Sequence, residues 1–308
     1  GNDTYHYTGE DGFDTITDTG GTDTIVFKTG YASKAPWKAP YRDGNNLVYV
    51  SENGKSGFTV VDHFLNTSKS IELFHYEDAD GGAYSIKVRN GNGAVGDSTY
   101  DEVLIGTTGD DTLTGIAGTK NRHDEFYGHT GNDTINNAAG GKSWIEAGDG
   151  NDTITGGAEQ DIIRGQAGND IIKGGDGNDT IYTGAGDDKV YGEAGDDTII
   201  QNGSGSQTYD GGSGTDTLKV DTSGGWVGTL NSSYPNSIEV NMATGIVGQT
   251  NNPNLRDTFT NMENITFVGS FDTLLTGDGN ANIIIGGAGN DTINGGDGND
   301  TIDGGAGN

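Results

Sequence analysis

The residues best suited to chemistry are carboxylates that recur every nine positions through the middle of the chain. The regular series is Asp152, Asp161, Asp170, Asp179, Asp188 and Asp197. Carboxylates can bind hard divalent cations such as Ca²⁺, and a close pair of them can perform the acid–base steps of glycoside hydrolysis. No pair stands apart from the others here, so the regularity favours repeated cation binding over one catalytic centre.

The elements that must position these carboxylates are short strands joined by glycine-rich turns. Residues 147–200 divide into six nonapeptides without a gap, with Asp always at position 6 and an aliphatic residue always at position 8. The glycine-rich half can take positive φ and turn sharply, whereas the β-branched half favours a strand whose position 8 points inward. One unit cannot bury a core, so stacked units must share one. The position-8 residues are Ile154, Ile163, Ile172, Ile181, Val190 and Ile199.

These nonapeptides match the consensus G-G-x-G-x-D-x-U-x and resemble the RTX (repeats-in-toxin) calcium-binding repeat. The resemblance implies an all-β chain that forms a right-handed parallel β-roll, a type of β-solenoid, interrupted by β-rich inserts. It also implies multiple Ca²⁺ ions, each held between the turns of repeats n and n+2 by Asp carboxylates and turn carbonyls. A metal-free glycine-rich solenoid is disfavoured because stacked, unpaired carboxylates would repel one another.

The predicted metal ligands lie at position 6 and at the turn glycines. The carboxylates are Asp14, Asp23, Asp111, Asp124, Asp133, Asp152, Asp161, Asp170, Asp179, Asp188, Asp197, Asp216, Asp291 and Asp300. The turn residues are Gly148, Gly150, Gly157, Gly168, Gly175, Gly177, Gly184, Gly186, Gly195, Gly287 and Gly289. Glu159 replaces a turn glycine, Gln207 and Asn282 replace the expected Asp, and the register slips near Ser143. Full calcium occupancy is not expected at those turns.

The overall charge also calls for counterions. The chain has 46 Asp and Glu against 16 Lys and Arg, a formal net charge of −30, and only 30% hydrophobic residues. Such a composition is typical of disordered chains unless the charge is neutralised, which roughly fifteen Ca²⁺ ions would do. The acidic excess argues against nucleic acid and anionic membranes as partners. With no Cys there are no disulfides or thiolate sites, and no apolar run of about 18 residues predicts a transmembrane segment.

Two non-repetitive blocks interrupt the repeats. The predicted organisation is a short repeat stack at 1–27, a β-rich insert at 28–103, the main roll at 104–219, a β-rich insert or cap at 220–270, and further repeats at 271–308. Short strands are expected in the first block at 47–50, 58–61, 71–76 and 84–88. Both ends fall inside a repeat, so we expect a fragment of a longer protein.

Three functions remain open. The first is a structural module of a secreted RTX protein, such as an adhesin, surface-layer component or toxin, that folds on meeting extracellular calcium. The second is the calcium-binding part of a secreted lipase, protease or polysaccharide-modifying enzyme whose catalytic domain lies outside this chain. The third is binding of a cell-surface or glycan ligand, with Trp37, Trp144 or Trp226 as stacking platforms.

Catalysis within this chain is not expected. Neither H-E-x-x-H nor G-x-S-x-G occurs in the sequence, so the zinc-protease and serine-hydrolase signatures are missing. The RTX resemblance implies an extracellular location reached by type I secretion, with attachment to the cell surface as one form of it.

Overall fold

In the computed structural model, all regular elements of the described residues are strands. The described residues are 4–7, 13–16, 23–27, 41–43, 46–50, 57–60, 71–77, 83–90, 94–95, 101–116, 123–222, 237–249 and 256–307. They form two long sheets and one small sheet. Within these ranges, no helix has the length and apolarity that a membrane crossing needs.

The larger sheet has 14 strands and extends along the whole molecule. Its strands are β1 (Thr4–Tyr7), β3 (Asp23–Phe27), β7 (Ile71–Glu77), β8 (Ala83–Asn90), β10 (Asp101–Ile105), β12 (His123–Thr130), β14 (Lys142–Asp149), β16 (Ile162–Ala167), β18 (Thr180–Tyr182), β20 (Thr198–Gln201), β22 (Thr217–Asp221), β26 (Asn264–Val268), β28 (Ile283–Ile285) and β30 (Thr301–Asp303).

The second sheet has 12 strands and the small sheet has 4. The second sheet consists of β9 (Ala94–Val95), β11 (Thr112–Thr114), β13 (Thr134–Asn136), β15 (Thr153–Thr155), β17 (Ile171–Asp176), β19 (Lys189–Ala194), β21 (Thr208–Asp210), β25 (Arg256–Thr260), β24 (Ile246–Gln249), β23 (Ser237–Asn241), β27 (Asp272–Thr276) and β29 (Thr292–Asn294). The small sheet consists of β2 (Phe13–Ile16), β4 (Tyr41–Asp43), β5 (Asn46–Val50) and β6 (Gly57–Val60).

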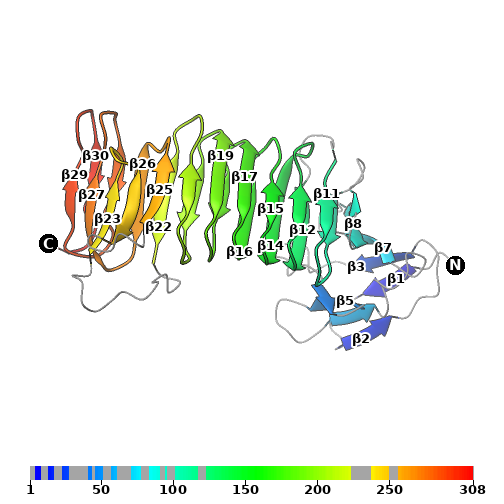
Figure 1. Ribbon diagram of the computed structural model, residues 1–308. Helices are drawn as coiled ribbons and strands as arrows, with labels where there is room; N and C mark the ends of the chain where they lie inside the picture. Colours follow the sequence, from blue (N-terminus) through cyan, green and yellow to red (C-terminus); the bar gives the residue numbers. More distant parts are fainter. Residues whose placement is uncertain are drawn as a thin grey trace.

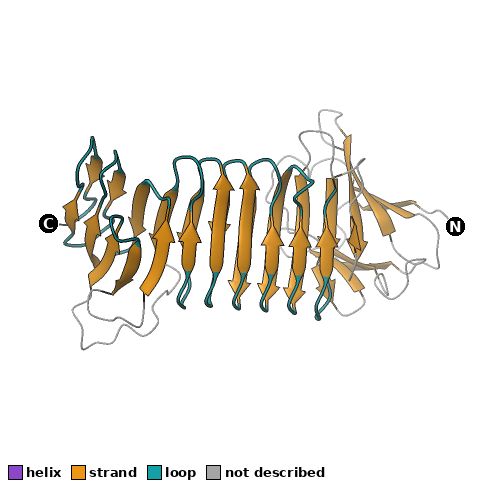
Figure 2. Cartoon of the chain, turned by 45° about the horizontal axis from the view of Figure 1, so that its top comes forward, coloured by secondary structure: helices purple, strands orange, loops and turns teal. Residues whose placement is uncertain are grey.

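In the repeat region the chain alternates between the two long sheets, so two repeats complete one coil. Neighbouring strands within a sheet are parallel, as where Ile154 pairs with Ile172 and Ile163 pairs with Ile181. The strands lie across the long axis of an elongated stack (Figure 1, Figure 2). This arrangement confirms the predicted all-β, parallel β-roll.

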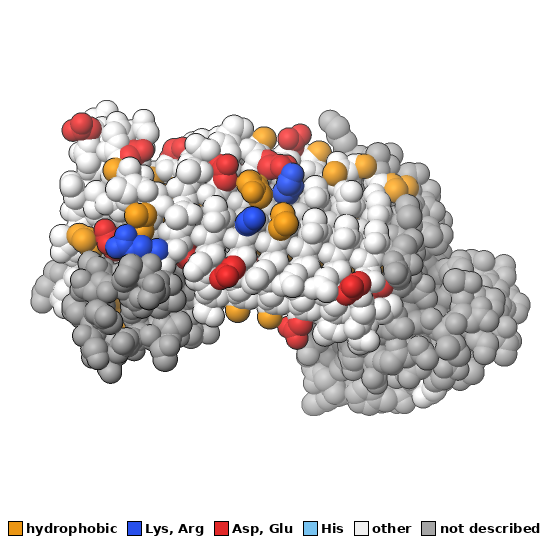
Figure 3. Space-filling view, viewed as in Figure 1, with side chains coloured by type: hydrophobic (Ala, Val, Ile, Leu, Met, Phe, Trp, Pro, Cys, Tyr) orange, Lys and Arg blue, Asp and Glu red, His pale blue; other side chains and the backbone are white. Residues whose placement is uncertain are grey.

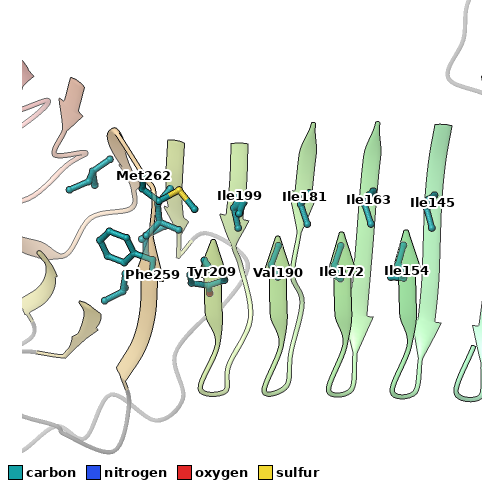
Figure 4. Close-up of a cluster of buried hydrophobic side chains, with 14 of the residues drawn as sticks. Ile145, Ile154, Ile163, Ile172, Ile181, Val190, Ile199, Tyr209, Phe259 and Met262 are labelled. Carbon is teal, nitrogen blue, oxygen red and sulfur yellow. The ribbon is translucent and has the colours of Figure 1, made fainter. Parts of the chain in front are cut away.

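The core is a double row of position-8 side chains. Ile145 and Ile163 come from the larger sheet, and Ile154 and Ile172 come from the second sheet (Figure 4). All four are 0% exposed. Position 8 points inward on each strand, so stacking the coils joins the apolar side chains into one continuous cluster. The same pattern explains why a single repeat has no core of its own.

The first non-repetitive block contains the strands expected from its sequence. β5, β6, β7 and β8 overlap the ranges predicted at 47–50, 58–61, 71–76 and 84–88. β1 and β3 pair with Tyr5 opposite Ile25, while β2 pairs with β6 in the small sheet. Trp37 lies outside the described residues.

The range 220–270 holds both an insertion and two strands of the roll. β25 continues the second sheet with Phe259 opposite Tyr209, and β26 continues the larger sheet with Ile265 opposite Leu218. Between β25 and β27 the antiparallel strands β24 and β23 are inserted into the second sheet only. The roll therefore passes through part of the range expected as an insert or cap, because Phe259 and Ile265 supply the inward side chains of a coil.

Candidate metal centre

The position-6 carboxylates lie where each glycine-rich turn enters a strand, in two rows along the edges of the roll. Side chains alternate along a strand, so a residue two positions before an inward position 8 also points inward. This geometry buries groups that are charged at neutral pH. The Asp residues that are at most 5% exposed are Asp111, Asp124, Asp133, Asp152, Asp161, Asp170, Asp179, Asp188, Asp197, Asp216 and Asp257.

One oxygen of each carboxylate links successive coils. Asp170 Oδ1 accepts a hydrogen bond from the N–H of Asp152 at 2.9 Å, and Asp188 Oδ1 accepts one from the N–H of Asp170 at 2.9 Å. At the opposite edge, Asp179 Oδ1 accepts a bond from the N–H of Asp161 at 2.8 Å. These bonds form two ladders of carboxylates, in which each Asp is held by the backbone of the preceding coil.

The second oxygen of most of these carboxylates has no protein partner. A buried charged oxygen without a donor is costly, because it has lost its water and gained nothing in exchange. These oxygens therefore require a cation or a proton. The buried, unpartnered Oδ2 atoms belong to Asp133, Asp152, Asp170, Asp179, Asp188, Asp197, Asp216 and Asp291.

Glycine at position 1 leaves space beside most of these oxygens, although Ala147 and Thr183 hold that position before Asp152 and Asp188. A Cβ on Gly174 would lie 2.4 Å from Asp179 Oδ2 and 2.7 Å from the carbonyl oxygen of Gly192 in the next coil. A Cβ on Gly192 would lie 2.3 Å from Asp197 Oδ2. The free carboxylate oxygen and a carbonyl oxygen thus converge on a cradle that any larger residue would fill.

The turn glycines at positions 2 and 4 bring further carbonyl oxygens together. Gly186 has φ of +141°, and a Cβ there would lie 2.0 Å from the carbonyl oxygen of Gly168 in the preceding coil. Non-glycine residues at position 2 are forced into the left-handed region as well, with φ of 77° at His129, 73° at Gln166 and 76° at Glu193. The stacking of coils therefore imposes the turn conformation even where it is strained.

The electrostatics of the two ladders favour binding of a positive charge. Burial raises the pKa of Asp170 to about 8, offset in part by the hydrogen bond from Asp152 and reinforced by the charges of Asp188 and Asp152. Burial likewise raises the pKa of Asp179 to about 8, with further contributions from the charges of Asp161 and Asp197.

On the outer face shown in Figure 3, acidic side chains are dispersed and a few basic ones gather with apolar side chains over the middle of the roll.

The donors present fit Ca²⁺. They are carboxylate and carbonyl oxygens, which are the hard ligands that this ion prefers. Among the described residues, no three His, Asp or Glu side chains form a metal-binding group by themselves, so backbone carbonyls must complete each site. The residues that would hold the ions are the position-6 Asp residues with an unpartnered oxygen together with the turn residues Gly148, Gly150, Gly168, Gly175, Gly177 and Gly195. Gly157, Gly184 and Gly186 lie at the same positions 2 and 4 of the stacked turns.

Asp161 differs from its neighbours because the protein satisfies both of its oxygens. Its Oδ2 accepts a hydrogen bond from the N–H of Gly157 at 2.6 Å, and its Oδ1 accepts one from the hydroxyl of Ser143 at 2.8 Å. Ser143 pairs with Asp124 across β14 and β12, so it occupies position 6 and the extra residue of this repeat lies in its turn. Asp111 is an intermediate case: its Oδ2 accepts hydrogen bonds from Thr107, at 2.5 Å from the N–H and 2.9 Å from the hydroxyl, whereas its buried Oδ1 has no partner.

The predicted ligands near the two ends of the chain are less uniform. Asp14 lies in β2 and Asp23 in β3, and their side chains lie outside the described residues. Asp291 Oδ1 accepts hydrogen bonds from Thr273, and Asp300 Oδ1 accepts one from the N–H of Asn282 at 3.0 Å. The turn residues near this end are Gly287, whose Cβ would lie 3.1 Å from Gly269 O, and Gly289, whose Cβ would lie 2.3 Å from Phe271 O.

Sequence reasoning missed two acidic residues that occupy position 6. Asp257 follows Gln207 in one ladder, and its Oδ1 accepts the N–H of Gln207 at 2.8 Å. Glu263 follows Asp216 in the other ladder, and its Oε2 accepts the N–H of Asp216 at 2.7 Å. Both are followed two positions later by an inward residue, Phe259 or Ile265. That spacing was the available signal, but no glycine-rich turn precedes either residue.

Trp144 stands on the roll, where its ring is covered in part by a neighbouring side chain. The guanidinium carbon of Arg164 lies 5.1 Å from the centre of the Trp144 ring and 4.1 Å from that of Tyr182. Arg164 also lies 4.0 Å from Glu146. These contacts explain the presence of Trp144 as one member of a stack of side chains across neighbouring strands. Trp226 lies outside the described residues.

The unequal satisfaction of the carboxylates predicts that Asp179→Asn and Asp161→Asn will behave differently. Asp179→Asn should lower the number of bound calcium ions. It should also lower the free energy of unfolding by about 3 kcal/mol, because it removes the carboxylate from a buried pair of carboxylate and calcium charges. The dependence of that free energy on calcium concentration should also become shallower. Equilibrium dialysis and urea unfolding at several calcium concentrations measure both effects.

Asp161→Asn is the matched control. It should cost about 1–3 kcal/mol, because Asn keeps only one acceptor oxygen and therefore loses the hydrogen bonds from either Gly157 or Ser143, while the number of bound ions stays unchanged. An equal loss of calcium in the two variants would show that the partners of Oδ2 do not decide which carboxylates take up ions.

The comparison with known proteins agrees with this geometry. Residues 98–119, 121–141, 137–172, 164–199 and 272–308 match the family described as RTX calcium-binding nonapeptide repeat (4 copies). No curated protein matches the chain at a significant level. The matched residues contain most of the carboxylates with an unpartnered oxygen and the glycine cradles beside them.

Proposed function

This chain carries RTX calcium-binding repeats, and we propose that it is a structural module of a secreted protein that folds when it meets extracellular calcium. The observation that carries this proposal is the row of buried carboxylate oxygens without a protein partner. Most of these oxygens face a space beside a position-1 glycine that they share with a backbone carbonyl oxygen. A protein that folded without cations would have to bury the whole row as unpaired charge or as neutral acid.

The physical basis is linkage between ion binding and folding. In the unfolded chain the carboxylates are hydrated and far apart, whereas the coils bring them together in ladders with donors for only one oxygen each. Bound calcium would supply the positive charge that the ladders need. Ions that bind only the folded state stabilise that state by mass action, so a chain with net charge −30 would be unfolded at low calcium and compact at high calcium.

We further propose an adhesin, surface-layer component or toxin as the parent protein, with no catalytic centre in this chain. The strands stack into an elongated body whose two ends lie far apart (Figure 1). This shape suits a module that holds the neighbouring parts of a longer protein at a distance from each other. The buried carboxylates of the described coils have a common place and common backbone partners in the ladders, which supports a structural role for them.

A calcium titration tests the proposal. Chain stripped of metal at pH 7.5 is mixed with increasing calcium, and far-ultraviolet circular dichroism and light scattering report β structure and compaction. We expect a cooperative transition from coil to β structure at extracellular, roughly millimolar, calcium, and none with equal magnesium, because the smaller Mg²⁺ demands octahedral geometry and dehydrates reluctantly. Full β structure in the presence of EDTA at pH 7.5 would refute the proposal.

A further inference from the structure

One turn of the roll has an amide where the other turns have a carboxylate. Gln207 occupies position 6 between Asp188 and Asp257, as shown by the pairing of Tyr209 with Val190 in β19 and with Phe259 in β25. Its backbone donates to the next residue of the ladder as in the other turns, because the N–H of Gln207 donates to Asp257 Oδ1 at 2.8 Å. The difference therefore lies in its side chain alone, which is 2% exposed.

The side-chain amide of Gln207 bonds to carbonyls of the preceding turn. Its Nε2 donates to the carbonyl oxygens of Gly184 and Gly186, each at 3.3 Å. These two glycines occupy positions 2 and 4 and have φ of +90° and +141°, like the turn glycines beside the unpartnered carboxylates. An amide nitrogen carries two hydrogens, so one group satisfies both carbonyls.

The amide is held in place by its own oxygen. Gln207 Oε1 accepts hydrogen bonds from the hydroxyls of Tyr209 and Thr183, the latter at 3.4 Å. Tyr209 stands in the core row where most coils have an aliphatic residue (Figure 4), and Thr183 stands at position 1, where glycine is usual. Three departures from the repeat thus meet at one point, and each supplies a hydrogen-bond partner to another.

The next residue of this ladder is satisfied by the protein as well. Asp257, which is 3% exposed, accepts the N–H of Gln207 with Oδ1 and the side-chain amide of Gln201 with Oδ2. From Gln207 through Asp257 to Thr273, no described position-6 residue of this edge retains a buried carboxylate oxygen without a partner. This contrasts with Asp133, Asp152, Asp170 and Asp188 earlier in the same ladder.

We propose that Gln207 takes the place of a calcium ion, so that the pair of turns at 183–188 and 202–207 is closed without metal. The amide hydrogens occupy the carbonyls that an ion would need, and the carboxylate that would attract the ion is missing. This inference rests on the proposed calcium-dependent folding and refines it, because it separates a calcium-dependent part of the ladder before Gln207 from the segment between Gln207 and Thr273, which the protein itself satisfies. The unpartnered Oδ2 of Asp291 lies beyond that segment.

Asn282 provides a second instance in the other ladder. Its Nδ2 donates to the carbonyl oxygen of Glu263 at 2.9 Å and to Asp278 Oδ1 at 3.2 Å, while its Oδ1 accepts the N–H of Asp278 at 3.0 Å. An amide at position 6 therefore again bonds to the preceding coil and to its own turn, where other turns leave a carboxylate oxygen free.

The test compares calcium stoichiometry in the full chain and in Gln207→Asp by equilibrium dialysis at saturating calcium. Gln207→Asp restores the carboxylate and frees the carbonyls of Gly184 and Gly186, so we expect one additional ion per chain. Gln160→Asp is the matched control, because Gln160 is exposed and the same substitution there adds charge outside the ladder. It should leave the count unchanged.

A second measurement covers the case in which Gln207→Asp does not fold. Anomalous scattering from crystals of the unmodified chain grown with calcium should show ions beside Asp152, Asp170 and Asp179 but none between the turns at 183–188 and 202–207. An ion between those turns, or an unchanged count in folded Gln207→Asp, would overturn the inference while leaving calcium-dependent folding intact. A chain that binds no calcium at all would overturn both.

Discussion

Lowering the pH of metal-free chain from about 8 to about 4 is expected to restore much of the β structure that removal of calcium abolishes. Burial raises the pKa of Asp170 and Asp179 to about 8 in the folded roll, against about 3.9 in an unfolded chain. The folded state therefore binds more protons than the unfolded state between these values, and its stability falls as pH rises through them. Below about pH 4 Asp170 and Asp179 are neutral in the folded roll, and their part of the stability is fully present.

The same linkage has the opposite direction when calcium is present. Ca²⁺ binds the ionised carboxylate, so acidification should displace the ions, and the loaded roll should be most stable above the pH at which the ladders ionise. Circular dichroism across pH 4–8, with and without calcium and with light scattering to detect aggregation, separates the two regimes. The double variant Asp170→Asn, Asp179→Asn is the control, and its metal-free form should show a weaker pH dependence. A metal-free chain whose β content does not change between pH 4 and pH 8 would contradict the raised pKa of Asp170 and Asp179 in the folded roll.

Gly186→Ala is expected to open the middle of the roll even at saturating calcium. Gly186 has φ of +141°, and a methyl group there would lie 2.0 Å from the backbone oxygen of Gly168. Because both atoms belong to or are fixed on the backbone, the contact can be relieved only by moving one coil relative to the other. Strain of this kind costs about 1–3 kcal/mol before any contact is lost, and with the displaced turn we expect about 3 kcal/mol in total. Because each coil contacts only its neighbours, hydrogen exchange of residues 165–190 is a better measure than global unfolding.

Gly279→Ala is the matched control for that substitution. A Cβ on Gly279 would meet nothing within 4 Å, and its φ lies outside the positive range. The added methyl should be neutral or should stabilise by up to about 1 kcal/mol, since it restricts only the unfolded chain. Equal exchange rates in the two variants would mean that the stacked turns are looser than their close carbonyl contacts indicate.

The sequence by itself determined the fold and the chemical class of the ligands. Nine-residue periodicity with an inward residue at position 8 leaves few solutions other than a stack of coils, because no single unit can bury its own apolar side chain. Asp at position 6 shares the inward direction of position 8, so a buried row of carboxylates follows from the same alternation. Continuation of the roll through Phe259 and Ile265 was hidden, since β25 and β26 lack the glycine-rich turns that mark the other repeats.

Only the tertiary structure decided which carboxylates need a cation. Asp161 and Asp179 both stand at position 6, in repeats of neighbouring coils, yet Ser143 and Gly157 satisfy both oxygens of Asp161 while Asp179 Oδ2 has no partner. In the same way, the sequence indicates only that Gln207 replaces an expected Asp ligand. The structure shows that its side-chain amide donates hydrogen bonds to the carbonyl oxygens of Gly184 and Gly186 in the preceding turn. The reason is that partners come both from the adjacent coil, as the Ser143 hydroxyl does, and from the residue's own turn, as the Gly157 N–H does. A repeat pattern specifies what each residue is but not which donor faces it in the folded stack.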